Sequence, residues 1–179
     1  MSKLEGVTVD FPVKVVEYAT VRDLQLATSR GKRPGNPNSV LLGEVGTADT
    51  ALATRQVFGD QADPLDTIRH ELTHIVTNYA TRQHPGTDAW IDEGISMYSQ
   101  KVIEREYTQA LDTMYKQNKA YPLNSLSSPS IRSNDSSGFY GQAWAIIKFM
   151  IDKYGQDKFR DFVKALNTND TDGALKQAL

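Results

Sequence analysis

One short motif constrains this chain more than any other feature, the run His70-Glu71-Leu72-Thr73-His74. Residues four apart on an α-helix lie one turn above each other, so His70 and His74 can direct two imidazole nitrogens at one ion. Glu71 lies about 100° around the helix from His70, given about 3.6 residues per turn. A carboxylate beside the ion can take a proton from a water molecule there. The spacing therefore predicts a helical metal site with a base next to it.

The residues around the motif are those of a helix. Asp63 is a favoured N-cap residue, and Pro64 suits the first helical position. Apolar residues then recur at helical spacing, namely Leu65, Ile68, Leu72, Ile75, Val76 and Tyr79. The motif histidines and Glu71 fall largely off this stripe. The alternative, a chance match on an amphipathic helix, has odds of about one in a hundred in a chain of this length.

Glu93 is the best-placed third ligand, because a catalytic zinc site takes three protein ligands and a water. It follows His74 by 19 positions, enough for the first helix to end and a second helix to return antiparallel. The alternative is a surface carboxylate, and the apolar neighbours argue against it: Trp90, Ile91, Ile95 and Met97. Gly94 costs about 1 kcal/mol relative to Ala inside a helix. We therefore expect the second helix to pack closely against the first at Gly94.

The third histidine of the chain, His84, is a weaker candidate. A metzincin would need Gly at position 77 and His at position 80, and this chain has Thr77 and Ala80. We interpret His84 as an exposed loop residue, with substrate contact as the alternative.

Composition indicates an ordinary globular protein. The chain has 179 residues, which predicts one domain over 1–179. Its net charge of −2 gives no general case for a nucleic acid or an anionic membrane as partner. There are no cysteines, which excludes disulfides and thiolate ligands. No apolar run reaches the length of a membrane span. We expect a monomer, and the sequence leaves its localisation unknown.

The rest of the chain predicts a small N-terminal sheet and a helical C-terminal half. Strands are expected within 7–18 and 40–45, with a weaker candidate at 50–58. Helices are expected at 20–29, 88–117, 139–154 and 156–166, the last two separated by Gly155. Residues 118–138 predict a long loop with a short turn at 123–126, and Thr171 or Asp172 is expected to cap a final segment.

Three blocks of the sequence resemble a known family. The spacing from His70-Glu71-x-x-His74 to Glu93 is the gluzincin layout. The run Trp90-Ile91-Asp92-Glu93-Gly94-Ile95-Ser96-x-Tyr98 resembles the W-L-x-E-G-F-A-x-Y block of the aminopeptidase N family. Later blocks resemble its Y-x-x-G helix and G-x-x-x-F segment, namely Tyr140-Gly141-Gln142-Ala143 and Tyr154-Gly155-x-x-x-Phe159. Overall, the chain is most similar to the small bacterial peptidase MA-like domains of the same clan.

The resemblance implies an α+β zincin of the thermolysin-like (gluzincin) type, with a small mixed sheet, an active-site helix and a helical C-terminal half. It implies one Zn²⁺ per chain, held by His70, His74 and Glu93, and hydrolysis of a peptide or protein substrate with Glu71 as general base. By position, the oxyanion-stabilising tyrosine of the family falls on Tyr140. A core tyrosine at the start of a helix is the alternative for that residue.

The sequence also departs from the aminopeptidase pattern. The G-x-M-E-N motif that binds a free amino terminus is absent, and Gly43-Glu44 is not a convincing substitute. Exopeptidase activity therefore does not carry over. The family's large N-terminal β domain is missing, and such domains often continue beyond the point that corresponds to Leu179, which suggests an excised piece of a longer chain. Two rival functions stay open: a zinc-binding module without peptidase activity, and a structural domain with a chance motif.

Overall fold

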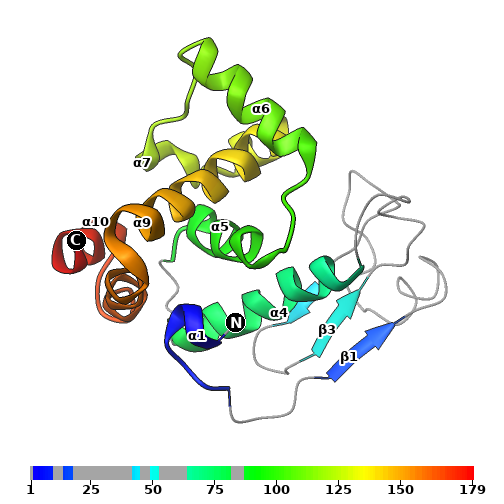
Figure 1. Cartoon of the computed structure of the whole chain (residues 1–179), viewed down its shortest axis with the longest axis vertical. Helices are drawn as coiled ribbons and strands as arrows, with labels where there is room; N and C mark the ends of the chain where they lie inside the picture. Colours follow the sequence, from blue (N-terminus) through cyan, green and yellow to red (C-terminus); the bar gives the residue numbers. More distant parts are fainter. Residues whose placement is uncertain (1, 10–13, 18–41, 45–48, 53–63, 82–86) are drawn as a thin grey trace.

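The computed structural model describes residues 2–9, 14–17, 42–44, 49–52, 64–81 and 87–179. The helix expected at 20–29, most of the strand candidate at 50–58, and His84 lie outside these ranges. Among the described residues, a small sheet and a short helix precede a long series of helices (Figure 1).

The N-terminal part contains a mixed sheet of three short strands: β1 (Lys14–Glu17), β2 (Leu42–Glu44) and β3 (Asp49–Leu52). The strand order is β1-β3-β2, with β1 parallel and β2 antiparallel to the central β3. All three overlap predicted strand regions. The short helix α1 (Ser2–Glu5) precedes them and was not predicted.

The motif helix is α4 (Pro64–Ala80), which begins at the expected proline. It contacts β2 and β3 on one side and α5 on the other, so it lies between the sheet and the helical half (Figure 1). Ile75 and Val76 are buried as expected. Leu65 and Tyr79, at the two ends of the predicted stripe, are instead exposed, although their neighbours Asp66 and Ala80 are buried.

The region 88–117 is two helices rather than the single long one expected. Helix α5 (Ala89–Ser99) ends at the extended residue Gln100, and α6 (Arg105–Lys116) begins five residues later. The physical reason is a side chain on α4: the carboxylate of Asp66 accepts hydrogen bonds from the backbone N–H groups of Lys101 and Val102, at 2.8 and 3.1 Å. These bonds hold the chain in a non-helical path after α5.

The region 118–138 is also more ordered than the predicted loop. The expected short turn is helix α7 (Leu123–Leu126), and a second helix, α8 (Pro129–Asn134), follows it. Pro129 led us to expect a break, but proline is compatible with the first turn of a helix, where its missing N–H group has no partner to lose. Pro129 therefore begins α8.

The C-terminal region forms α9 (Ser136–Ala165) and α10 (Thr171–Ala178). Gly155 has φ 85° and ψ 163°, so α9 is two helical segments joined at the predicted stop. The N-cap of α10 is Asp170 rather than Thr171 or Asp172, and its side chain accepts a hydrogen bond from the N–H of Gly173.

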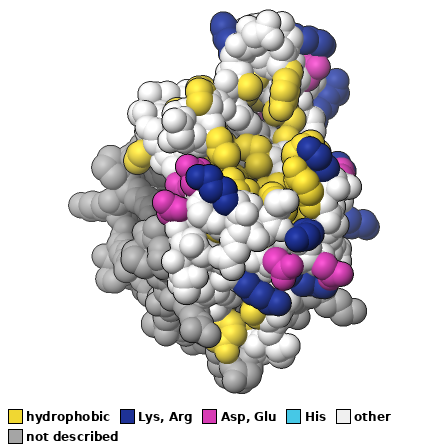
Figure 2. All heavy atoms as spheres, turned by 90° about the vertical axis from the view of Figure 1, so that its left-hand side faces the viewer, with side chains coloured by type: hydrophobic (Ala, Val, Ile, Leu, Met, Phe, Trp, Pro, Cys, Tyr) yellow, Lys and Arg dark blue, Asp and Glu magenta, His cyan; other side chains and the backbone are white. Residues whose placement is uncertain are grey.

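Large side chains fill the core between α5, α9 and α10, notably Trp90, Phe139, Ile147, Phe159 and Phe162. On one face of the molecule, other hydrophobic side chains gather with charged side chains around them (Figure 2).

Gly94 permits a close helix contact, but with a different partner from the one expected. A Cβ atom there would lie 2.6 Å from the carbonyl oxygen of Ala143 and 2.8 Å from the side chain of Ile147, both on α9. Atoms cannot pack at such distances, so a larger residue at position 94 would force the two helices to shift. The expected approach of α5 to α4 at this residue was wrong: Gly94 seats α5 on α9, on the side of the helix away from the motif.

Candidate metal centre

Helix α4 places the motif residues together. The rings of His70 and His74 lie edge to face with centroids 4.9 Å apart, and one ligand atom from each of His70, Glu71 and His74 falls within 4.8 Å of the other two. Glu71 is almost fully buried, with 3% of its surface exposed. The two imidazoles keep limited exposure. These three residues form a candidate metal site.

Glu93 on α5 points at the same two imidazoles. Its Oε2 atom lies 3.4 Å from Nε2 of His70 and 3.6 Å from Nε2 of His74. Ligand atoms around a tetrahedral zinc, with bonds of about 2.0–2.1 Å, lie about 3.3 Å apart. Both distances from Glu93 are close to this spacing, and a His₂Glu donor set suits a catalytic zinc site.

Two carboxylates therefore compete for the third position. Glu71 belongs to the group whose ligand atoms lie within 4.8 Å of one another, and Glu93 presents one oxygen to both Nε2 atoms at 3.4 and 3.6 Å. By geometry, either carboxylate can complete a three-ligand site with the two histidines.

His74 has two further partners on α5. Its Nδ1 atom lies 2.9 Å from Oδ2 of Asp92 and 3.1 Å from the hydroxyl of Ser96. A histidine that donates Nδ1–H to a carboxylate keeps the lone pair of Nε2 available for a metal. Neither Asp92 nor Ser96 was predicted as a site residue from the sequence. Ser96 follows Glu93 by three positions and so shares its helix face, a signal that could have identified it.

The charges around the imidazoles suit a cation. Burial lowers the pKa of His74, but the carboxylates of Asp92, Glu93 and Glu71 raise it overall to about 9. Burial raises the pKa of Glu93, yet the contact with His70 and the positive charges of His74 and Arg132 hold that pKa below its usual value. Burial also raises the pKa of Glu71. Glu93 is thus kept ionised, while Glu71 gains affinity for a proton.

Arg132 reaches Glu93 from the other side of the site and links it to Tyr140. Arg132 on α8 places Nη2 2.5 Å from Oε1 of Glu93 and donates a hydrogen bond of 3.1 Å to the hydroxyl of Tyr140 on α9. The guanidinium also lies over the rings of Phe139 and Tyr140. Arg132 therefore connects the Tyr140 hydroxyl to the carboxylate of Glu93. Arg132 was not a sequence candidate, and its serine-rich surroundings gave no signal for it.

Hydroxyl groups fix α4 against the end of α5. Thr73 donates a 2.8 Å hydrogen bond to Ser99, and Ser99 lies within hydrogen-bond distance of the carbonyl oxygens of Arg69 and Ser96. Together with the Asp66 contacts, these bonds set the register of the two helices. The position of Glu93 relative to the histidines follows from that register.

Comparison with known families decides the affiliation of the chain. Residues 1–179 match the Peptidase MA superfamily. The chain belongs to this superfamily. Searches of curated proteins and of solved structures found no match. Membership in the superfamily, together with the His70–Glu71–His74 group, indicates a metallopeptidase. Among the described helices of this family member, none is long and apolar enough to cross a membrane.

Proposed function

We propose that this member of the Peptidase MA superfamily is a zinc-dependent peptidase with the gluzincin form of the zincin fold. One zinc ion would be held by Nε2 of His70, Nε2 of His74 and Oε2 of Glu93. The single observation that carries the proposal is the convergence of these three atoms, with Glu93 3.4 and 3.6 Å from the two histidines and Glu71 buried beside them. The mixed sheet, the motif helix and the helical half support the assignment of the fold.

Zinc in such a site would lower the pKa of a water molecule to about 7 and polarise a carbonyl group. Glu71 would take a proton from the attacking water and pass it to the leaving amine. Its burial supports this role, because burial raises the pKa of the carboxylate and so makes it a stronger base. Asp92 would hold His74 in the tautomer that leaves Nε2 free.

Tyr140 would donate a hydrogen bond to the carbonyl oxygen as negative charge develops on it. Two observations support this: its hydroxyl meets Arg132, which also binds Glu93, and burial raises its pKa, which keeps the hydroxyl protonated. The ring also packs against the core, so the alternative of a core tyrosine describes part of its environment. Tyr140→Phe separates the two roles, because it keeps the packing and removes the donor.

The test is Glu71→Gln, assayed on a peptide mixture with bound zinc measured in the same samples. We expect turnover to fall by about 10²–10⁴-fold, the usual contribution of a general base. Bound zinc should stay at one equivalent, because Glu71 is not a ligand in this arrangement. A chelator should abolish wild-type turnover, and added zinc should restore it.

Two results would overturn the proposal. Wild-type turnover in Glu71→Gln would exclude Glu71 as the base. Zinc-loaded wild-type protein that cleaves no peptide in the mixture would favour the rival, a zinc-binding module without peptidase activity.

A further inference from the structure

We infer that the cavity beside Arg132 is a substrate subsite that binds a carboxylate group of the peptide, either an acidic side chain or the free C-terminus. This inference rests on the proposed peptidase function and adds a substrate class to it. Three features support it: the shape of the cavity, the charge of its wall, and its position next to the metal centre.

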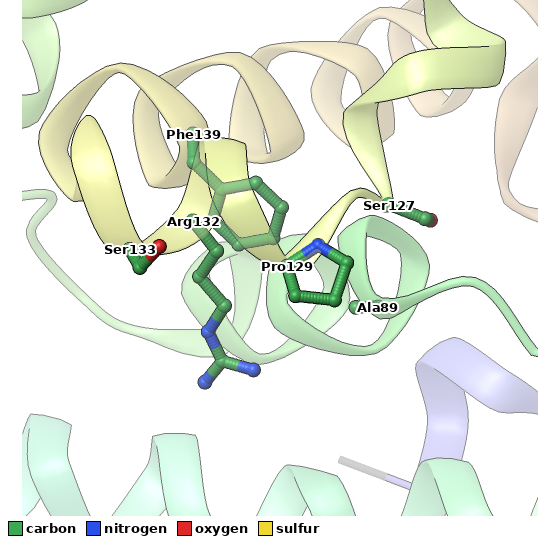
Figure 3. A pocket seen from close by; sticks show the side chains of 6 residues that line it. All are labelled: Ala89, Ser127, Pro129, Arg132, Ser133 and Phe139. Atoms are coloured by element: carbon green, nitrogen blue, oxygen red, sulfur yellow. The ribbon is translucent and has the colours of Figure 1, made fainter. Parts of the chain in front are cut away.

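The cavity has a volume of about 400 Å³ and is lined by Ala89, Ser127, Pro129, Arg132, Ser133 and Phe139. Figure 3 shows the Arg132 side chain extended past the Phe139 ring, with Ser133 on one side and Pro129 and Ala89 on the other. The size is that of a small-molecule site and accommodates any amino-acid side chain. The volume alone therefore does not identify the occupant. The chemical groups that line the cavity indicate which ligand it binds.

Arg132 is the only charged side chain in the described lining, so the wall is cationic. A guanidinium carries five N–H donors in a planar fork. Only Nη2 is engaged by Glu93 and Tyr140, and the other two nitrogens have no hydrogen-bond partner among the described residues. The side chain is 44% exposed, so these donors can reach a ligand. A planar carboxylate is the group that such a fork binds best.

The remaining lining residues fit the rest of such a substrate residue. Ala89, Pro129 and Phe139 are apolar and can pack on an aliphatic stem, and the Ser133 hydroxyl lies beside Arg132 on the same helix. Arg132 is also held in place, because its guanidinium lies 5.9 Å from the centre of the Phe139 ring and 5.8 Å from that of Tyr140. These ring contacts and the ion pair with Glu93 orient the guanidinium, although α8, which carries it, has no buried side chain.

The Arg132 side chain connects the cavity to the proposed metal site. Arg132 lines it and also contacts Oε1 of Glu93, whose other oxygen faces the two histidines. A residue bound there would lie within a few residues of the bond being cleaved. Its carboxylate would therefore influence where the enzyme cuts.

The experiment has two stages. Peptides cleaved by the zinc-loaded protein are first identified in a peptide mixture by mass spectrometry. One such peptide is then made with Glu, Gln or Leu at each position within three residues of the cleaved bond. A second arm compares a free C-terminus with a C-terminal amide, which distinguishes a side-chain carboxylate from a terminal one.

We expect a carboxylate at one position to raise kcat/KM over the matching amide by about ten-fold or more, the size of a charge-assisted hydrogen bond. Arg132→Gln should remove this ratio, and Arg132→Lys should keep part of it. The ratio is the useful quantity, because Arg132 also contacts Glu93 and Tyr140 and its loss can lower turnover on every peptide.

A second variant leaves the metal centre untouched. Ser133→Asp adds a negative charge to the cavity wall and should reduce the ratio several-fold, whereas Ser133→Asn has the same size without the charge and should not. Asn134→Asp adds the same charge one residue further along α8, outside the cavity lining, and serves as the control.

The possible outcomes are distinct. Cleavage with no preference for a carboxylate at any position, or with a preference for Leu, overturns the inference and leaves the peptidase proposal intact. A preference that survives both Arg132→Gln and Ser133→Asp also overturns it, because the carboxylate then binds elsewhere. Absence of cleavage by zinc-loaded protein overturns the peptidase proposal and this inference together.

Discussion

The two sides of the candidate site differ in how firmly the fold holds them. The histidine side of the site, which comprises His70, His74 and Glu93, lies on α4 and α5. These helices have 17 and 11 residues, and α5 buries Trp90, Ile91 and Ile95 completely. The Arg132 side stands on α8, a helix of six residues with no buried side chain. Glu93 is 6% exposed, whereas the Arg132 side chain is 44% exposed.

This difference separates two tasks of a metallopeptidase. Metal ligands need fixed spacing, because zinc accepts a narrow range of bond lengths and angles. A substrate-binding wall can adjust, because it meets peptides of different sequence. We therefore expect changes on the histidine side to affect zinc binding, and changes on the Arg132 side to affect substrate use with little effect on zinc.

The largest expected effect is that of Glu93→Gln on zinc affinity. Replacing the proposed third ligand should weaken zinc binding by more than about 100-fold. This exceeds the roughly 10–100-fold loss that is typical when a residue that hydrogen-bonds to a ligand is replaced. Competition with a chromophoric chelator measures this. Glu106→Gln changes an exposed glutamate on α6 and should leave the affinity unchanged. A loss below ten-fold in Glu93→Gln would mean that Glu93 is not a ligand.

The next largest effect is expected on stability, from a change in the packing of α5 against α9. Gly94→Ala places a Cβ atom 2.6 Å from the Ala143 carbonyl oxygen. The resulting overpacking should lower the free energy of unfolding by about 1–3 kcal/mol, seen as a reduced Tm and a lower urea midpoint. Gly173→Ala in α10 is the matched control, since its neighbours there are side-chain atoms at 3.0 Å or more. Equal stability of Gly94→Ala and wild type would contradict the fixed packing of the histidine side.

A smaller effect is expected for the partner of His74. Asp92→Asn removes the negative charge beside Nδ1 and should weaken zinc binding by about ten-fold. Ser96→Ala removes the more distant hydroxyl and should have less effect. A larger loss in Ser96→Ala than in Asp92→Asn would show that the hydroxyl, and not the carboxylate, orients the imidazole.

The smallest expected effect on zinc is that of Arg132→Gln. Loss of the contact with Glu93 should loosen the carboxylate, while loss of a nearby positive charge should favour the cation. The two effects oppose each other, so we expect the affinity to change by no more than about three-fold. Isothermal titration with zinc measures it. A loss of zinc affinity as large as that of Asp92→Asn would show that Arg132 supports the metal ligands. It would contradict the proposed difference between the two sides of the site.

Local patterns predicted the part of the site that lies on the motif helix α4. The spacing of His70 and His74 and the proline at position 64 depend on one helix alone, and α4 begins where expected. The strands within 7–18 and 40–45 and the break at Gly155 were likewise visible in short stretches of sequence. The apolar neighbours of Glu93 predicted that it is not a surface carboxylate, and it is buried.

Local sequence patterns could not predict the contacts between segments that lie far apart in the chain. The end of α5 depends on Asp66, 35 residues earlier, and the partner of Gly94 is Ala143, far later in the chain. Arg132 reaches Glu93 from a short helix among serines, where no periodicity marks it. Such contacts depend on the tertiary arrangement of the helices, which composition and spacing do not determine.

A crystal structure of the zinc-loaded protein tests the central proposal most directly. We expect zinc within about 2.2 Å of Nε2 of His70, Nε2 of His74 and Oε2 of Glu93, with the Glu71 carboxylate close by but not bound to the metal. Zinc coordinated by Glu71, with Glu93 contacting only Arg132, would contradict both the ligand set and the role of Glu71 as base.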